Sequence, residues 1–179
     1  MSQNENRQQW RAKYRPYIVA AALAFALTLL VVPEVMDGKS MEPTIGEGSI
    51  TVATKKSYSE KRGAPELGQV VLLEKPYSKK IAEDNLVGRV VGLPGEKIEI
   101  KEGRFYRDGE EYSLEGSAGA LGADLSLKLG AEEVFILSDN LEEQLDSRNS
   151  KLGPVPLKEI KGNIKFILWP FSNFGAVSN

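Results

Sequence analysis

The sequence predicts an all-β domain, either a barrel or a pair of packed antiparallel sheets, behind one N-terminal transmembrane helix. Three features of the chain predict this fold. An uncharged apolar run lies near the N-terminus, short β-rich runs separated by Gly, Pro, Asn and Asp follow it, and an Asp-Gly pair stands between two arms of alternating residues. No long helical periodicity follows the apolar run, and 179 residues with 41% hydrophobic content can bury one core.

The apolar run extends from Tyr17 to Val32 without a charge. Roughly 16 residues at about 1.5 Å rise span on the order of 24 Å, which is short for a ~30 Å hydrocarbon core but feasible when the flanking residues lie in the interfaces. The residues at 31–34, Val-Val-Pro-Glu, hold no small-x-small cleavage pattern. An uncleaved anchor is therefore favoured over a cleaved signal peptide or a buried core helix.

The charge distribution predicts the orientation of this anchor. Arg7, Arg11, Lys13 and Arg15 precede the run against a single Glu5, and the positive-inside rule keeps such a segment in the cytoplasm. We therefore expect a basic cytoplasmic tail, a single-pass signal anchor in the cell membrane and an extracytoplasmic β domain, with the boundaries 1–16, 17–33 and 34–179.

Six short apolar runs are predicted as strands. They are residues 50–53, 70–73, 86–91, 98–100, 134–137 and 164–169. Residues 105–112 alternate on either side of Asp108-Gly109, which predicts a β-hairpin. Residues 57–65 and 113–130 are polar or Gly-rich, so both are predicted as loops or insertions between strands.

Composition excludes several classes of function. A net charge of -2 and a pI near 5.4 give no basic excess, so nucleic acid is not expected as a partner. The chain has no cysteine and no histidine, which excludes disulfides, thiolate nucleophiles, Ser-His dyads and imidazole metal sites. A nucleophile must find its base among lysines, carboxylates or the N-terminal amine, and neither a metal nor a cofactor is expected.

Three motifs follow the anchor in a fixed order. Residues 38–44, Gly-Lys-Ser-Met-Glu-Pro-Thr, place an exposed serine close to the membrane surface. Alone, a serine between glycine and proline is far more often a turn residue than a nucleophile. Residues 89–95 read Arg-Val-Val-Gly-Leu-Pro-Gly, and the third motif is Ser-Asp-Asn at 138–140 with Asp-Ser-Arg at 146–148. In this order behind one anchor, the motifs resemble those of the type I signal peptidases.

Members of that family are membrane-anchored serine endopeptidases with a β-rich fold. They remove signal peptides from exported proteins after small residues, on the outer side of the membrane, with a Ser/Lys dyad. The resemblance implies that Ser40 is the nucleophile and that Asp146 and Arg148 form an ion pair bracing the site. It assigns groove or support positions to Gly38, Met41, Pro43, Gln144, Asp146 and Arg148. The expected partners are membrane lipid and signal peptides or secreted and surface proteins, bound as extended peptides by strand addition.

Two departures from the family pattern fall on the catalytic unit. The family's lysine base stands immediately before the arginine of the second motif, and here that residue is Gly88. The family's serine that orients the lysine is here Gln144. Three further family positions, a Gly, an Arg and an Asp, are Ser138, Leu141 and Ser49. Because a serine hydroxyl is a poor nucleophile without a base, glycine at 88 predicts a loss of at least roughly 10²- to 10⁴-fold in activity.

Three other lysines are candidates for a replacement base. Lys39 neighbours Ser40, but adjacent side chains of an extended segment point in opposite directions, so it is expected to face away. Lys97 and Lys151 match no catalytic position of the family. All three are expected on the solvated surface.

The sequence therefore leaves two functions open. In the first, the protein is a signal peptidase with Ser40 as nucleophile and strongly impaired activity. In the second, it is a catalytically silent homologue that binds secreted or surface proteins and assists their assembly, as a pilus-type chaperone does. The retained Ser40 favours the first, and the paired changes at Gly88 and Gln144 favour the second and argue against an introduced glycine.

The orientation can be tested with protease added outside intact cells or spheroplasts. Because basic residues precede the uncharged run, the protease is expected to digest the domain after residue 36 and to spare the N-terminal tail, as followed by immunoblotting of each end. Protection of the domain from external protease would exclude this orientation.

Overall fold

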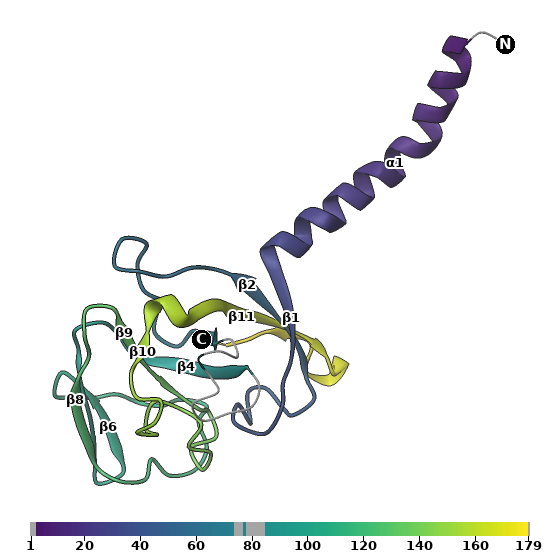
Figure 1. Cartoon of the computed structure of the whole chain (residues 1–179). Coiled ribbons are helices and arrows are strands. Elements are labelled where there is room, and N and C mark those ends of the chain that lie inside the picture. Colours follow the sequence, from purple (N-terminus) through teal and green to yellow (C-terminus); the bar gives the residue numbers. More distant parts are fainter. Residues whose placement is uncertain (1–2, 74–76, 78–84, 179) are drawn as a thin grey trace. The chain divides into compact units, whose positions relative to one another are not determined.

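The structure, a computed structural model, describes residues 3–73, 77 and 85–178 of the chain. The chain divides into two compact units, residues 1–32 and 33–179. The first unit is helical and the second is built from strands (Figure 1).

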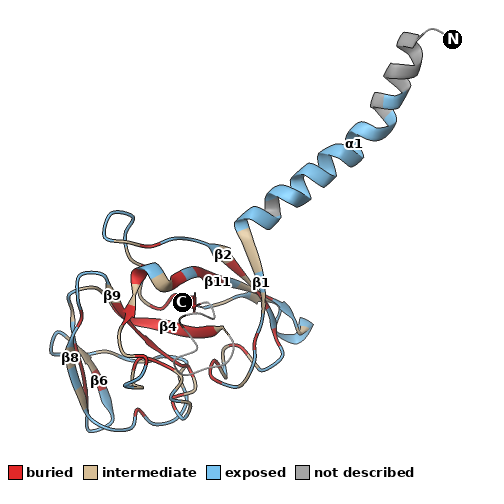
Figure 2. Ribbon diagram, in the orientation of Figure 1, coloured by how far each residue is buried: buried red, intermediate tan, exposed pale blue. Residues whose placement is uncertain are grey.

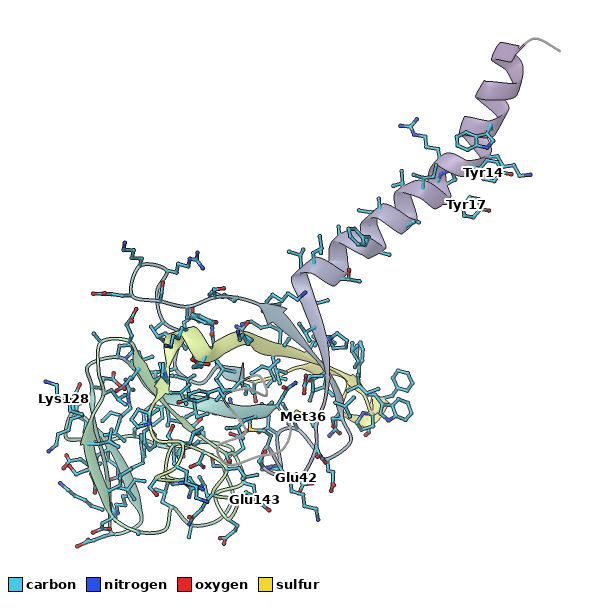
Figure 3. All side chains as sticks on the ribbon, in the orientation of Figure 1. Tyr14, Tyr17, Met36, Glu42, Lys128 and Glu143 are labelled. Atoms are coloured by element: carbon cyan, nitrogen blue, oxygen red, sulfur yellow. The ribbon has the colours of Figure 1, made fainter. Side chains whose placement is uncertain are left out.

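The first unit is the helix α1 (Gln3–Leu30). Its window Lys13–Leu30 has a mean hydropathy of 1.2, so the helix is long and apolar enough to cross a membrane by length and composition. Apolar side chains along it are exposed, and Tyr17, labelled in Figure 3, is 72% exposed. The side chains of Arg7 and Arg11, on which the predicted orientation partly rests, lie outside the described ones.

The boundaries of α1 differ from those expected from the sequence. The helix begins within the segment predicted as a polar tail, and it ends at Leu30, before the end of the uncharged run. Val31–Val35 forms the strand β1 instead. β-branched valines favour strands, and Pro33 disfavours a helical conformation in the residue before it.

The second unit contains two sheets. In the larger one the strands lie in the order β1-β2-β11-β3-β4-β9-β10, with β12 paired to β11. The bounds after β1 are β2 (Ile50–Lys55), β3 (Val70–Leu73), β4 (Leu86–Gly92), β9 (Glu133–Leu137), β10 (Val155–Pro156), β11 (Ile160–Trp169) and β12 (Gly175–Ala176). Two 3₁₀ turns, η1 (Leu157–Glu159) and η2 (Phe171–Asn173), flank β11.

The smaller sheet has the order β7-β6-β5-β8. Its strands are β5 (Lys97–Lys101), β6 (Arg104–Arg107), β7 (Glu110–Glu111) and β8 (Leu125–Lys128). Strands β6 and β7 form the hairpin predicted around Asp108-Gly109, with Arg107 opposite Glu110. Asp108 and Gly109 both have positive φ, as the tight turn requires.

The central strands of the larger sheet are buried on both faces (Figure 2). Every residue of β4 is buried. In β9, Val134 and Ile136 belong to one apolar cluster, whereas Phe135 and Leu137 belong to another. The near-continuous apolar sequence of these strands follows from this burial on two sides.

The all-β prediction is confirmed, and each of the six predicted runs lies within a strand. One loop prediction is wrong: residues 113–130 contain β8, which pairs with β5 through Ile98 and Leu127. The four residues of β8 alternate between half-buried and exposed positions. So short an alternation within a Gly-rich segment was missed.

Strands β2 and β11 approach closely at Gly162. A Cβ atom on this residue would lie 2.1 Å from the carbonyl oxygen of Thr54, inside any allowed contact distance. Glycine is therefore required for the pairing of Gly162 with Lys55 and of Asn163 with Thr54.

We expect Gly162→Ala to destabilise the protein by roughly 2 kcal/mol or more, because the added methyl group forces the two backbones apart. Thermal unfolding of the full-length chain in detergent measures the change. Gly46→Ala is the control, since its Cβ would meet only the Ser49 hydroxyl at 3.9 Å. Equal melting temperatures for the two variants would contradict this account of Gly162.

Candidate active site

Ser40 begins a tight turn that is anchored in the core. The amide of Ile45 donates a hydrogen bond to the carbonyl of Met41 at 2.8 Å, and both side chains are fully buried. Gly38, with φ of 77°, turns the chain just before the serine in a conformation that favours glycine. Ser40 was expected to be exposed but keeps only 6% of its surface, because Met41 draws the turn inward.

The loop that carries Ser40 is closed at its base. The amide of Met36 donates to the carbonyl of Ser49, and the amide of Gly48 donates to the carbonyl of Met36, both at 2.9 Å. Met36 and Glu42 are labelled in Figure 3. Pro43, assigned to the groove, is exposed in this loop. The closure fixes the ends of the serine-bearing segment.

The third motif contacts the first through the main chain. The amide of Asn140 donates to the carbonyl of Ser40 at 2.9 Å. The preceding residue, Asp139, is 1% exposed and accepts hydrogen bonds from Nε and Nη2 of Arg89 at 2.7 and 2.6 Å. The third motif therefore contacts the first at Ser40 and the second at Arg89, although 100 residues separate Ser40 from Asn140 in the chain.

The guanidinium of Arg89 uses all five of its N–H donors. Besides Asp139, it donates from Nη1 to the carbonyls of Gly68 and Ser178, both at 2.7 Å, and from Nη2 to the Thr44 hydroxyl at 3.5 Å. Arg89 is 8% exposed. A buried charge is tolerated only when it is paired and hydrogen-bonded, and this set of acceptors meets that requirement.

Asp146 and Arg148 hold the segment that follows Asn140. Asp146 is fully buried, and its carboxylate accepts hydrogen bonds from the amide of Ser138 at 3.0 Å and from the guanidinium of Arg148 at 2.7 Å. Arg148 also donates to the carbonyls of Leu121, Leu141 and Glu143. The ion pair suggested by the resemblance thus shapes the turn through several main-chain acceptors.

Gly88 and Gln144 occupy different environments. Gly88 is buried in β4, opposite Val71 of β3 and next to Arg89. Gln144 is exposed, and its Nε2 lies 3.4 Å from the place that a Cβ on Gly122 would take. Neither residue brings a basic group to Ser40.

The three other lysines considered as a base are exposed. Lys97 pairs with Glu99 at 3.0 Å in the smaller sheet. The Lys101 and Lys97 ammonium groups hold the pKa of the Glu99 carboxyl at about 2. Among the described residues, no group of three or more His, Cys, Asp or Glu residues could hold a metal ion.

The chain is similar to known proteins along most of its length. Residues 9–169 match the profile of a family described as signal peptidase, peptidase S26. Signal peptidase I P of Bacillus subtilis subsp. natto is 30% identical over 172 residues, which cover 87% of this chain and 87% of that protein. Signal peptidase I of Bacillus caldolyticus is 29% identical over 184 residues, covering 94% and 96%. A crystal structure of a signal peptidase I from Enterococcus faecalis V583 aligns with a TM-score of 0.46 and 20% identity, covering 60% of this chain and 98% of that chain.

We expect Arg148→Lys to destabilise the protein by about 2–4 kcal/mol, because lysine cannot serve the Asp146 carboxylate and the carbonyls together. Chemical denaturation provides the measurement. Arg104→Lys is the control, since Arg104 pairs with Glu111 at 3.1 Å on the exposed surface, where ion pairs contribute little. A smaller loss for Arg148→Lys than for Arg104→Lys would contradict the bracing role.

Proposed function

This chain belongs to the signal peptidase family, peptidase S26, and on that premise we propose that it is a signal peptidase I with Ser40 as nucleophile and with strongly impaired activity. In this proposal it removes signal peptides from exported proteins after small residues. It is anchored by α1 as a single span, with its N-terminus in the cytoplasm and the β domain outside.

The contact between Asn140 and Ser40 supports the proposal most directly. It is a main-chain hydrogen bond of 2.9 Å between the third motif and the nucleophile turn. Arg89 reaches both segments, through Asp139 and Thr44. A chain that keeps these contacts keeps the framework in which a serine can be presented to a peptide.

The edge of β4 offers a place for the substrate backbone. Leu86, Val87 and Gly88 pair with β3 on one side. On the other side, the β9 pairing begins only at Arg89, within the part of the chain that the structure describes. An extended peptide can add there as a further strand, hydrogen-bonding through its main chain.

A hollow lies next to this edge. It has a volume of about 580 Å³ and is lined by residues of β1, the loop after it and Asn85. The Asn85 amide donates to the Glu34 carboxylate at 3.0 Å. A peptide that continues past Asn85, the residue before β4, would enter this hollow.

The exposed aromatic side chains after β11 support a contact with lipid. Trp169 is the last residue of β11. It is 49% exposed and stacks edge-on against Phe171, with the ring centroids 4.9 Å apart. Phe171 and Phe174 are 74% and 57% exposed. Aromatic side chains that are partly exposed to solvent are favoured at the interface between membrane and water.

A specific observation favours the second function, a silent homologue that binds secreted or surface proteins. Both residues of the base unit have changed, to Gly88 and Gln144, whereas the buried pairs of Arg89 with Asp139 and of Arg148 with Asp146 remain. A protein that binds a peptide without cutting it needs the framework and the strand edge but no base.

Restoring the base unit tests the catalytic proposal. Gly88→Lys alone is expected to recover little, because a lysine without an orienting hydroxyl stays protonated and turns to solvent. Gly88→Lys with Gln144→Ser is expected to gain more than the sum of the single changes, since the two residues act as a unit. The assay is turnover of a peptide with alanine at the first and third positions before the cut.

The same double variant carrying Ser40→Ala is the control and is expected to be inactive. Robust cleavage by the unaltered protein that disappears in Lys39→Ala or Lys97→Ala would show a relocated base and overturn the expectation of a nearly silent site. Binding of the peptide with no cleavage in any variant would favour the silent homologue.

A further inference from the structure

Position 88 is packed tightly against a neighbouring side chain. A Cβ atom built on Gly88 would lie 2.9 Å from Cδ1 of Ile136, 3.2 Å from its Cβ and 3.3 Å from its Cγ1. Real Cβ atoms essentially never come within 3.0 Å of another heavy atom, and close-packed interiors resist even one extra methylene. A side chain at position 88 therefore requires Ile136 to shift.

The neighbour is fixed by the pairing of β4 with β9. Arg89 lies opposite Leu137 and Val90 opposite Ile136. Ile136 is fully buried in the same apolar cluster as Val71 and Val90. Its position is set by a packed strand interior, so it cannot swing into solvent to admit a longer residue.

Ser138 is the residue directly after β9, and as the second residue after Ile136 its side chain shares the face of Ile136 by the alternation of an extended chain. Its amide donates to the Asp146 carboxylate at 3.0 Å, beyond the last pair of β9 with β4. Ser138 is fully buried, and its Oγ has no hydrogen-bond partner among the residues that the structure describes. A buried hydroxyl without a partner costs free energy, and no polar group from β4 meets it.

We propose that Ile136 and Ser138 together seal position 88. In this proposal two strands together account for the missing base. β4 has no side chain at position 88, and Ile136 of β9 occupies the adjacent space. A lysine returned to position 88 meets Ile136 at its first carbon and is pushed away from Ser40. The inference rests on the proposed function insofar as it concerns catalysis, but the seal itself is a matter of packing.

The packing is tested first, by thermal unfolding of the full-length chain in detergent. Gly88→Ala is expected to lower the melting temperature by about 3 °C or more. In a chain that already carries Ile136→Val, which removes the Cδ1 atom, the same change is expected to cost clearly less. The matched control is Ile98→Val. The Cδ1 atom of Ile98, in β5, lies next to Gly92, which is in β4 like Gly88, so its removal is expected to give Gly88→Ala no relief.

The catalytic consequence is tested in the variant that carries both Gly88→Lys and Gln144→Ser. Adding Ile136→Val and Ser138→Gly is expected to raise kcat at least about tenfold while KM changes little, because the added room positions the base and leaves the peptide edge of β4 intact. The acid limb of the pH profile is expected to move to lower pH, since a lysine that reaches the buried site loses its proton more easily. Adding Ile98→Val in their place is expected to give neither effect.

The outcomes separate the seal from the proposed function. If Gly88→Ala lowers the melting temperature equally in the chain with Ile136 and in the chain with Ile136→Val, the seal is overturned. If Ile136→Val reduces the cost of Gly88→Ala but no variant with Gly88→Lys cleaves the peptide, the result supports the seal and counts against the proposed peptidase function. If the variant with Gly88→Lys and Gln144→Ser already has a high kcat, and adding Ile136→Val and Ser138→Gly does not raise it, the catalytic role of Ile136 and Ser138 is overturned.

Discussion

The buried ion pair between Arg89 and Asp139 is the contact on which the rest of the site depends. Through one guanidinium, β4 is joined to the turn after β9, to Thr44 of the turn that carries Ser40 and to the carbonyls of Gly68 and Ser178. Removing either charge would leave the other buried and unpaired, which is far more costly than the pair itself is favourable. The arrangement of the segments around Ser40 therefore depends on both charges being present.

Adjacent residues of a strand face opposite sides of the sheet, and this explains how the contacts of Arg89 can be kept with a glycine at position 88. Arg89 faces the acceptors that hold the site together, whereas Gly88 faces the apolar cluster that contains Ile136. Loss of a side chain at Gly88 therefore removes no acceptor from Arg89. An apolar side chain from β9 compensates by occupying the space, which keeps the core dense.

The strands with strong patterns could be predicted from the sequence, and the weak ones could not. The Asp108-Gly109 turn and the apolar strands β3 and β4 have local signals, whereas β8 is recognisable only by its pairing with β5. Ser40 and Gly88 stood out through their motifs. Ile136 did not, because an isoleucine in an apolar run has no signal beyond that of a core residue, and its closeness to Gly88 depends on register between strands. The acceptor at Ser178 lies beyond the residues matched by the family.

The place of β11 in the sheet imposes an order on biosynthesis. This strand, Ile160–Trp169, lies between β2 and β3 and pairs with both, although about 100 residues separate it from them in the chain. Until the ribosome has released it, β2 and β3 expose unpaired edges, which are prone to pair with other chains. Ser178, which completes the shell around Arg89, is made later still. During translation the nascent domain is therefore an open sheet, and the turn that carries Ser40 becomes fixed only after nearly the whole chain has been synthesised.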